Sequence, residues 1–145
     1  MNRLSGFRGR IVSGHKEAVF FTGLDWVVEQ CRRKLAFVPW PGTLNLVVDR
    51  DLGRQLAAAE NFLELSSPTP EFCSARVLPA VVEGIRAAVI IPEKEVRVHG
   101  DEIIEILAPV NLRQALDRRD NDPVSVTLVD FSDHPANQEK SPDES

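Results

Sequence analysis

The pattern of hydrophobic and polar residues predicts a chain made mostly of short β-strands. Residues 124–130 (VSVTLVD) alternate strictly between apolar and polar positions, which is typical of a strand with one buried face. Residues 73–84 and 85–91 are two β-rich runs that meet at Glu83-Gly84, so we expect a hairpin there. Three further strands are expected, at residues 7–13, 43–48 and 102–109.

Helical spacing marks other segments. Between residues 24 and 35, five apolar residues recur on one helical face, namely Leu24, Val27, Val28, Cys31 and Leu35. Thr22 and Asp25 resemble a capping box at the start of this helix, with Asp in place of the usual Glu. Residues 51–62 and 111–117 are expected to form shorter helices, and residues 11–17 to run from a strand into a loop.

The order of these elements favours a small β-barrel. About six strands and two or three short helices follow one another without regular alternation, which argues against a doubly wound parallel sheet. A mainly β fold, built as a mostly antiparallel barrel with helical excursions, fits better. We expect one domain over residues 1–131 and a disordered acidic tail over residues 132–145, because the tail is polar and contains Pro135 and Pro142.

Composition and charge exclude several classes of protein. The 145 residues suffice for one domain with a hydrophobic core, and the net charge of −5 gives no general attraction to nucleic acid or anionic membranes. The sequence contains no apolar run that could cross a bilayer and no apolar segment of a secretory signal. Cys31 and Cys73 make no disulfide framework, and Cys31 is expected to be a reduced, buried thiol. We therefore expect a cytoplasmic monomer that binds neither nucleic acid nor membrane.

Two polar residues in the stretch PWPGTLN are candidate metal ligands. Thr43 and Asn45 are two apart on a predicted strand and share one face, while Leu44 and Leu46 would face the core. Their neutral oxygens suit Mg²⁺ whose other ligands are phosphate oxygens and waters. The plainer alternative is a turn that leads into a strand. Near the first strand, Gly14 and Lys16 could also cradle a polyphosphate.

Several short blocks of sequence, taken in order, resemble one family. They are SG at 13–14, LAF at 35–37, PWPGTLNL at 39–46, VLP at 77–79, AVIIP at 88–92, EIIEILAP at 102–109, NLR at 111–113 and DNDPVSVTL at 120–128. The same blocks occur in the same order in archaeal CTP-dependent riboflavin kinases, which this chain resembles over residues 7–130.

The resemblance implies a fold, a reaction and a set of site residues. The fold is a six-stranded cradle-loop β-barrel, and the reaction moves the γ-phosphate of CTP to the 5′-hydroxyl of riboflavin, giving FMN and CDP. Thr43 and Asn45 match the residues that hold Mg²⁺ on the nucleotide, and Glu105 matches a residue that contacts the flavin. The implied nucleotide-binding residues are Gly14, His15, Lys16, Glu17, Leu112 and Arg113.

Two departures from the family pattern keep an alternative open. The loop SGxGEG is SGHKEA here, so Lys16 and Ala18 replace glycines, and Ala18 would resist a positive φ. Arg97 stands where the family has a flavin-contacting Thr, although His99 matches its neighbour. The alternative is a catalytically inactive flavin- or nucleotide-binding protein on the same barrel, ahead of a DNA-binding barrel or a purely structural module. The sequence offers no clear general base.

Overall fold

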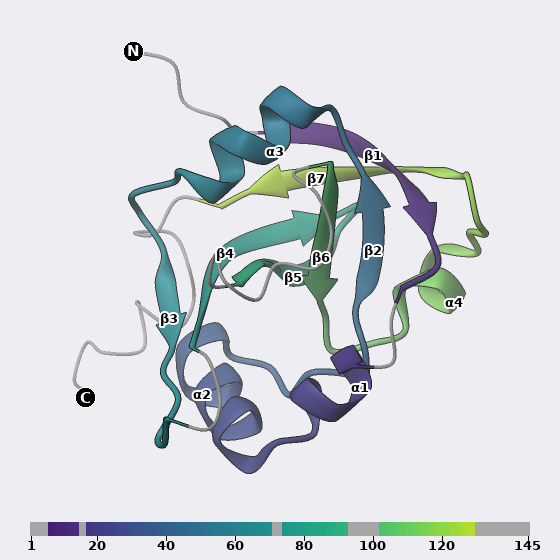
Figure 1. The fold of residues 1–145 in the computed structure, drawn as a ribbon. Helices are drawn as coiled ribbons and strands as arrows, with labels where there is room; N and C mark the ends of the chain where they lie inside the picture. Colours follow the sequence, from purple (N-terminus) through teal and green to yellow (C-terminus); the bar gives the residue numbers. More distant parts are fainter. Residues whose placement is uncertain (1–5, 15–16, 71–73, 93–101, 130–145) are drawn as a thin grey trace.

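A closed ring of six antiparallel strands forms the body of the molecule (Figure 1). The computed structural model describes residues 6–14, 17–70, 74–92 and 102–129. The ring strands are β1 (Gly6–Val12), β2 (Leu44–Val47), β4 (Ala75–Val82), β5 (Ile85–Pro92), β6 (Ile103–Leu107) and β7 (Pro123–Leu128). They pair in the order β4-β5-β6-β2-β1-β7, and β7 pairs again with β4. The expected six-stranded barrel is therefore confirmed.

A seventh strand, β3 (Leu63–Leu65), adds to the ring from outside. It pairs with the first residues of β4, up to Val77, whereas β7 pairs with β4 from Ala80 onward. One edge of β4 is thus divided between two partners. The sequence analysis missed β3, because three residues (LEL) are too few to show a period and lie just past the expected helix at 51–62.

Four short helices accompany the barrel, namely α1 (Glu17–Thr22), α2 (Asp25–Leu35), α3 (Arg50–Ala57) and α4 (Leu112–Leu116). The last three were expected, although α3 ends at Ala57 and not at residue 62, while the ends of α2 and α4 differ by one residue. The loop expected up to residue 17 is instead followed at once by α1, which the sequence analysis missed. None of the helices in the described ranges has the length and apolar character needed to span a membrane.

The expected capping box before α2 is wrong. The N-cap of α2 is Leu24, which makes no side-chain capping bond. Thr22 instead ends α1, where its hydroxyl donates to the carbonyl of Ala18 at 2.9 Å and lies 3.1 Å from that of Val19. Capping would require the Thr22 hydroxyl oxygen to accept an amide of α2, but here that oxygen accepts the amide of Gly42, at 2.9 Å.

Strands β4 and β5 are buried on both faces. Leu78, Val82 and Val89 face the barrel interior, while Val77 and Ile90 face a second cluster that α2 covers. Strands covered on both sides read as nearly continuous apolar runs, which explains why ARVLPAVV and IRAAVII lack alternation.

Helix α2 covers the second cluster with Val27, Cys31 and Leu35, each of which is fully buried. Burial raises the pKa of the Cys31 thiol to about 12, so the expected reduced, packed cysteine is confirmed. Cys73 and the tail expected to be disordered lie outside the described residues.

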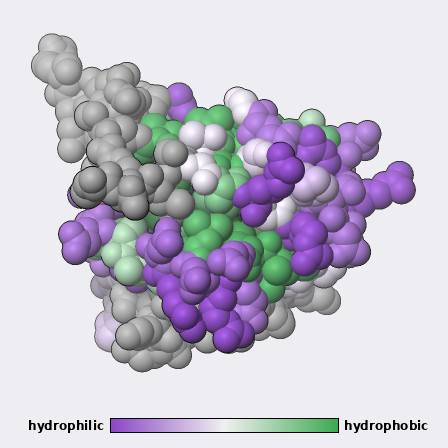
Figure 2. All heavy atoms as spheres, turned by 90° about the horizontal axis from the view of Figure 1, so that it is seen from above, coloured by the Kyte–Doolittle hydropathy of each residue, from purple (hydrophilic) through white to green (hydrophobic). Residues whose placement is uncertain are grey.

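Helix α3 lies across the other end of the barrel, where Leu56 is buried and Leu52 packs against the interior residues (Figure 1). Seen from that end, hydrophobic side chains form a band between hydrophilic areas of the surface (Figure 2). Helices α1 and α2 lie at the opposite end, so the two ends of the barrel differ in what covers them (Figure 1).

The hairpin expected at Glu83-Gly84 is confirmed, and an ion pair ties it to β7. Both turn residues have positive φ, 46° and 93°, which is typical of a two-residue type I′ turn. The Arg118 guanidinium donates to both carboxylate oxygens of Glu83, at 2.8 and 2.9 Å. The amide of Ser125 in β7 donates to the same carboxylate at 3.0 Å. The hydrogen bonds from Arg118 are the main cause of a lowered pKa at Glu83.

We predict that Glu83→Gln lowers stability at neutral pH but not in acid. Because the pKa of Glu83 is lower in the folded chain than in the unfolded chain, its carboxylate stabilises the fold above the unfolded pKa. That stabilisation is lost as the pH falls through the folded pKa. Urea unfolding should give a lower midpoint for the variant at pH 7, with the gap closing in acid. Exposed Glu60 provides the control, Glu60→Gln, and equal gaps at both pH values would contradict the prediction.

Candidate active site

Three side-chain oxygens meet where β2 lies between β1 and β6. Asn45 on β2 is opposite Glu105 on β6, and Thr43 precedes β2 by one residue. The Thr43 hydroxyl oxygen lies 3.0 Å from Asn45 Oδ1 and 3.1 Å from Glu105 Oε1. A hydroxyl has one proton, so Thr43 can donate fully to only one of these acceptors at a time. The structure therefore brings together two predicted metal ligands and the predicted flavin-contacting residue.

These separations fit a small divalent cation. Mg²⁺ binds oxygen at about 2.0–2.1 Å in octahedral geometry, so two adjacent ligands lie about 3 Å apart. The Thr43–Asn45 and Thr43–Glu105 distances, 3.0 and 3.1 Å, match that spacing. Within the described ranges, no group of three or more His, Cys, Asp and Glu side chains could hold a metal. Two neutral ligands, Thr43 and Asn45, with one carboxylate beside them suit a cation that brings phosphate oxygens with it.

The absence of a side chain at Gly14 leaves room for the Asn45 side chain. A Cβ atom at residue 14 would lie 2.6 Å from Asn45 Nδ2 and 2.7 Å from Asn45 Oδ1, closer than real contacts allow. Asn45 itself is only 3% exposed, so the amide has little space to move. Glycine at position 14 was expected to allow a close approach of phosphate to the main chain. The structure shows a second reason for glycine, namely the space that the Asn45 side chain needs.

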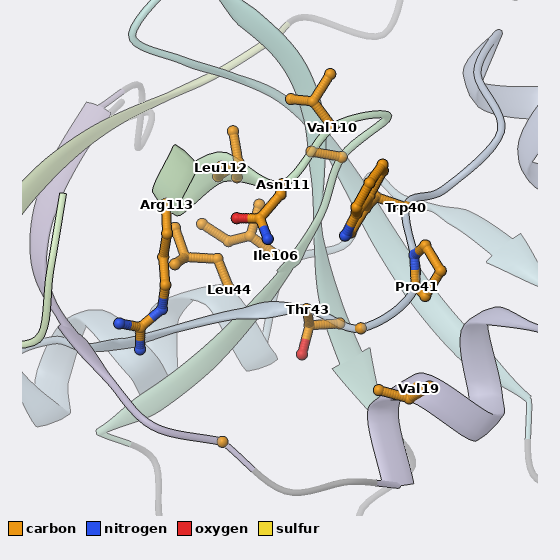
Figure 3. A pocket seen from close by; sticks show the side chains of 13 residues that line it. Val19, Trp40, Pro41, Thr43, Leu44, Ile106, Val110, Asn111, Leu112 and Arg113 are labelled. Carbon is orange, nitrogen blue, oxygen red and sulfur yellow. The ribbon is translucent and has the colours of Figure 1, made fainter. Parts of the chain in front are cut away.

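A cleft of about 260 Å³ opens beside this site (Figure 3). Arg113 and Asn111 line one side of it, and Trp40 and Val19 line the other, with Thr43 between them (Figure 3). Gly14 also lines the cleft. Thr43 therefore belongs both to the oxygen cluster and to the lining of the cleft. A ligand in the cleft could contact a cation held by the oxygen cluster.

The Pro-Gly turn that precedes Thr43 is tied to two other elements. The amide of Trp40 donates to the carbonyl of Ala108 at 2.8 Å, just after β6. The amide of Gly42 donates to the Thr22 hydroxyl at 2.9 Å, at the end of α1. Gly42 has a φ of 99°, which favours glycine. The turn thus anchors Thr43 against both α1 and the segment after β6.

Arg113 connects α4 to the end of β1. Its guanidinium lies 2.7 Å from Asp120 Oδ1 and donates to the carbonyl of Val12 at 3.3 Å. The Ser13 hydroxyl donates to Asp120 Oδ2 at 3.3 Å. These contacts hold the residues around Gly14 next to the cleft and place the Arg113 guanidinium, paired with Asp120, on its wall.

The other predicted site residues are not part of the oxygen cluster. Leu112 lines the cleft but is 4% exposed and packs in the barrel core, so its main chain is what a ligand could reach. Glu102 lies before β6, 3.8 Å from Arg50, away from the oxygen cluster. Glu17 begins α1, and three predicted residues lie outside the described ranges, namely His15, Lys16 and Arg97. His99 also lies outside them.

The expected difficulty at Ala18 does not arise. Ala18 lies within α1, where the backbone is helical, and it is not among the described residues with positive φ. Alanine is the residue most favoured in a helix interior. The segment that departs from the glycine-rich family pattern therefore begins a helix in this chain.

Sequence reasoning missed the cleft residues outside the predicted set. Val19 lies in the missed helix α1, so no pattern assigned it to a site. Trp40 lies within PWPGTLN and Asn111 within NLR, and both blocks were identified without assigning these two side chains a role. Of these three residues, Trp40 could have been assigned to the site from the sequence, because it directly precedes the turn that leads to the predicted metal ligand Thr43.

We predict that Gly14→Ala displaces the Asn45 amide. The added Cβ would overlap that side chain, so the free energy of unfolding should fall by about 1–3 kcal/mol, as at other overpacked sites. The NMR signals of the Asn45 side-chain amide should shift. Gly23→Ala is a matched control, because its Cβ would meet nothing closer than 3.6 Å. Unchanged amide signals in Gly14→Ala, with stability equal to that of the control, would show the contact to be unimportant.

Comparison with known proteins gives a family match over most of the chain. The family model named CTP-dep_RFKase, described as a domain of unknown function (DUF120), matches residues 11–128. A riboflavin kinase of Ignicoccus hospitalis is 35% identical over 129 residues, which cover 83% of this chain and 69% of that protein. A riboflavin kinase of Methanocella arvoryzae is 34% identical over 121 residues, covering 83% of this chain and 56% of that protein.

A riboflavin kinase of Archaeoglobus fulgidus is 32% identical over 128 residues. The match covers 84% of this chain and 54% of that protein. The chain thus spans about half to two thirds of the length of these curated relatives. The family match includes the blocks around Thr43, Asn45, Glu105 and Arg113. The chain belongs to the CTP-dependent riboflavin kinase family.

Proposed function

We propose that this protein transfers the γ-phosphate of CTP to the 5′-hydroxyl of riboflavin, giving FMN and CDP, with Mg²⁺ on the nucleotide phosphates. The observation that carries the proposal is the position of the Thr43 hydroxyl oxygen beside the cleft, 3.0 Å from Asn45 Oδ1 and 3.1 Å from Glu105 Oε1, each about one octahedral edge. Family membership and relatives named riboflavin kinase support the reaction. CTP as donor rests on the family name, and a cytoplasmic monomer remains a prediction.

Thr43 and Asn45 would hold Mg²⁺ through one oxygen each. When bound, Mg²⁺ offsets negative charge on the phosphates and so lowers the barrier to phosphoryl transfer. Arg113 supplies a fixed positive charge to the cleft wall, and main-chain groups around Gly14 and Leu112 offer further donors. In the transfer, the riboflavin O5′ forms a bond to the γ-phosphorus as the bond to the bridging oxygen of CDP breaks. The proton of the riboflavin 5′-hydroxyl passes to solvent water.

Glu105 would bind the acceptor. An ionised carboxylate only accepts hydrogen bonds, and the ribityl chain of riboflavin offers several hydroxyl donors. Since Glu105 Oε1 lies 3.1 Å from the Thr43 hydroxyl, a riboflavin hydroxyl held by Glu105 would lie close to the metal ligands. Holding both reactants in this geometry can remove several kcal/mol of the barrier without covalent chemistry, on the order of 7–11 kcal/mol in favourable cases.

The alternative is a protein that binds flavin or nucleotide on the same barrel without catalysis. The altered segment SGHKEA motivates it. The helical position of Ala18 weakens this motive, because no positive φ is required there. The alternative predicts tight binding of riboflavin or CTP with no FMN produced.

We predict that the purified protein forms FMN from riboflavin, Mg²⁺ and CTP. Chromatographic assays with CTP, ATP, GTP and UTP would identify the donor. Thr43→Ala and Asn45→Ala should each lower the rate more than about 100-fold, since even the outer partners of metal ligands are worth 10–100-fold. Exposed Thr127 on β7 provides the control, Thr127→Ala, which should keep its rate.

The other outcomes of this assay distinguish a kinase with a different nucleotide donor, the inactive alternative and a metal site elsewhere. FMN from a different nucleotide would keep the reaction and change the donor. Ligand binding by calorimetry with no FMN from any donor would favour the inactive alternative. Normal rates in both ligand variants would remove Thr43 and Asn45 from the metal site.

We predict that Glu105→Gln raises the KM for riboflavin about tenfold and the KM for CTP much less. A hydrogen bond to a charged group is worth about 1.5–3 kcal/mol, and about 1.4 kcal/mol corresponds to a factor of ten. Initial rates at varied riboflavin and varied CTP would separate the two constants. Glu102→Gln is the matched control, because Glu102 belongs to the same sequence block but faces Arg50. An unchanged KM for riboflavin would exclude this role for Glu105.

A further inference from the structure

The cleft has an apolar wall that is unusually exposed. Val19, Trp40 and Val110 all line it and are 53%, 47% and 38% exposed. The position of Trp40 is well fixed, because prolines flank it on both sides and its amide donates to Ala108. Large apolar side chains held at a concave surface are typical of a site for a flat apolar group.

The polar groups of the cleft lie apart from this wall. Thr43 and Gly14 border the oxygen cluster, and Arg113 lies on the side away from Trp40 (Figure 3). A nucleotide has the same division between charged phosphates and a flat base. With phosphates at Thr43, Gly14 and Arg113, the base would face the wall formed by Trp40, Val19 and Val110.

Asn111 adds a directional donor to the cleft. Its Oδ1 accepts the amide of Gln114 at 3.2 Å as the N-cap of α4. This bond fixes which way the amide group is turned, and Nδ2 points into the cleft between Arg113 and Trp40 (Figure 3). An amide nitrogen only donates, so it binds base edges that present an acceptor. N3 is an acceptor in cytosine and carries a proton in uracil, so a donor placed at N3 distinguishes the two bases, whereas O2 accepts in both.

We propose that Trp40 is the stacking surface for the nucleotide base and that Asn111 Nδ2 donates to the acceptor edge of that base. The proposal rests on the proposed function, because it assigns the cleft to the nucleotide donor. It makes Trp40 a determinant of nucleotide affinity and Asn111 a determinant of which nucleotide the protein uses. Stacking supplies affinity for any base, since every base has a π-face, and the Asn111 donor supplies the preference.

Tryptophan fluorescence tests the stacking directly. The chain has two tryptophans, so Trp26→Phe leaves Trp40 as the only reporter. Trp26 contacts Phe21 edge to face at 5.9 Å, and phenylalanine keeps an aromatic ring there. CDP should quench Trp40 fluorescence in this variant, while inorganic pyrophosphate, which has no base, should not. Equal effects of both ligands, or no effect of CDP at saturation, would overturn the stacking.

Affinity measurements test the two residues separately. By calorimetry, Trp40→Ala should weaken CDP binding at least about tenfold, the range of base–aromatic stacking, and Trp40→Phe much less. Asn111→Ser keeps a neutral capping oxygen but loses Nδ2, the amide donor that points into the cleft, so it should reduce the preference for CDP over UDP. Val38→Ala is the control, because Val38 is 47% exposed but does not line the cleft.

Failure of this inference can be told apart from failure of the proposed function. If the protein forms FMN from CTP while Trp40→Ala and Asn111→Ser keep the KM for CTP and the choice of donor, the inference is wrong and the function stands. If no donor gives FMN, the fluorescence and calorimetry with CDP still decide whether the base binds at Trp40. Urea unfolding of each variant excludes loss of the fold as the cause.

Discussion

Closure of the barrel is the constraint on which the rest of the structure depends. Each ring strand has a partner on both sides, and the pairing of β4 with β7 completes the ring. With the ring closed, β2 has β1 on one side and β6 on the other, so Asn45 lies opposite Val12 on one neighbour and Glu105 on the other. The site therefore consists of residues that are distant in sequence and meet only because these strands are adjacent.

The two sides of the barrel are specialised differently. Around β4 and β5, both faces are apolar and covered, with α2 on the outside and the interior core within. Around β2 and β6, the strands are shorter and carry Asn45 and Glu105 among apolar neighbours. A buried polar side chain is costly unless it has a partner, and here Thr43 hydrogen-bonds Asn45 and Glu105. The free energy gained by close packing around β4 and β5 offsets the free-energy cost of burying polar side chains around β2 and β6.

Much of this arrangement could be predicted from the sequence. Strand alternation in residues 124–130, the apolar runs around Glu83-Gly84 and the helical spacing behind Cys31 each indicated the right element, because those signals are local. The pairing of Thr43 with Asn45 on one face also followed from a period of two. Their meeting with Glu105 did not, since it depends on which strands become neighbours.

The missed features have physical reasons. Strand β3 and helix α1 are held by neighbours rather than by their own pattern, since β3 is three residues long and α1 only six. The Thr22 hydroxyl was assigned to the wrong helix because the capping-box pattern considers only spacing along the chain, whereas the amide that this hydroxyl accepts is that of Gly42, 20 positions away. The close contact of Gly14 with Asn45 joins residues 31 positions apart, and no local rule reports such a contact.

The hydrogen bond from Gly42 to the Thr22 hydroxyl has a consequence for how the site responds to ligands. It joins α1, which carries Val19 in the cleft wall, to the turn that carries Thr43. A cation that shifts Thr43 would then also shift α1, and a base that shifts the wall would also shift Thr43. Linkage requires the two effects to be equal in free energy. Through this one bond, the two halves of a metal–nucleotide ligand would bind cooperatively.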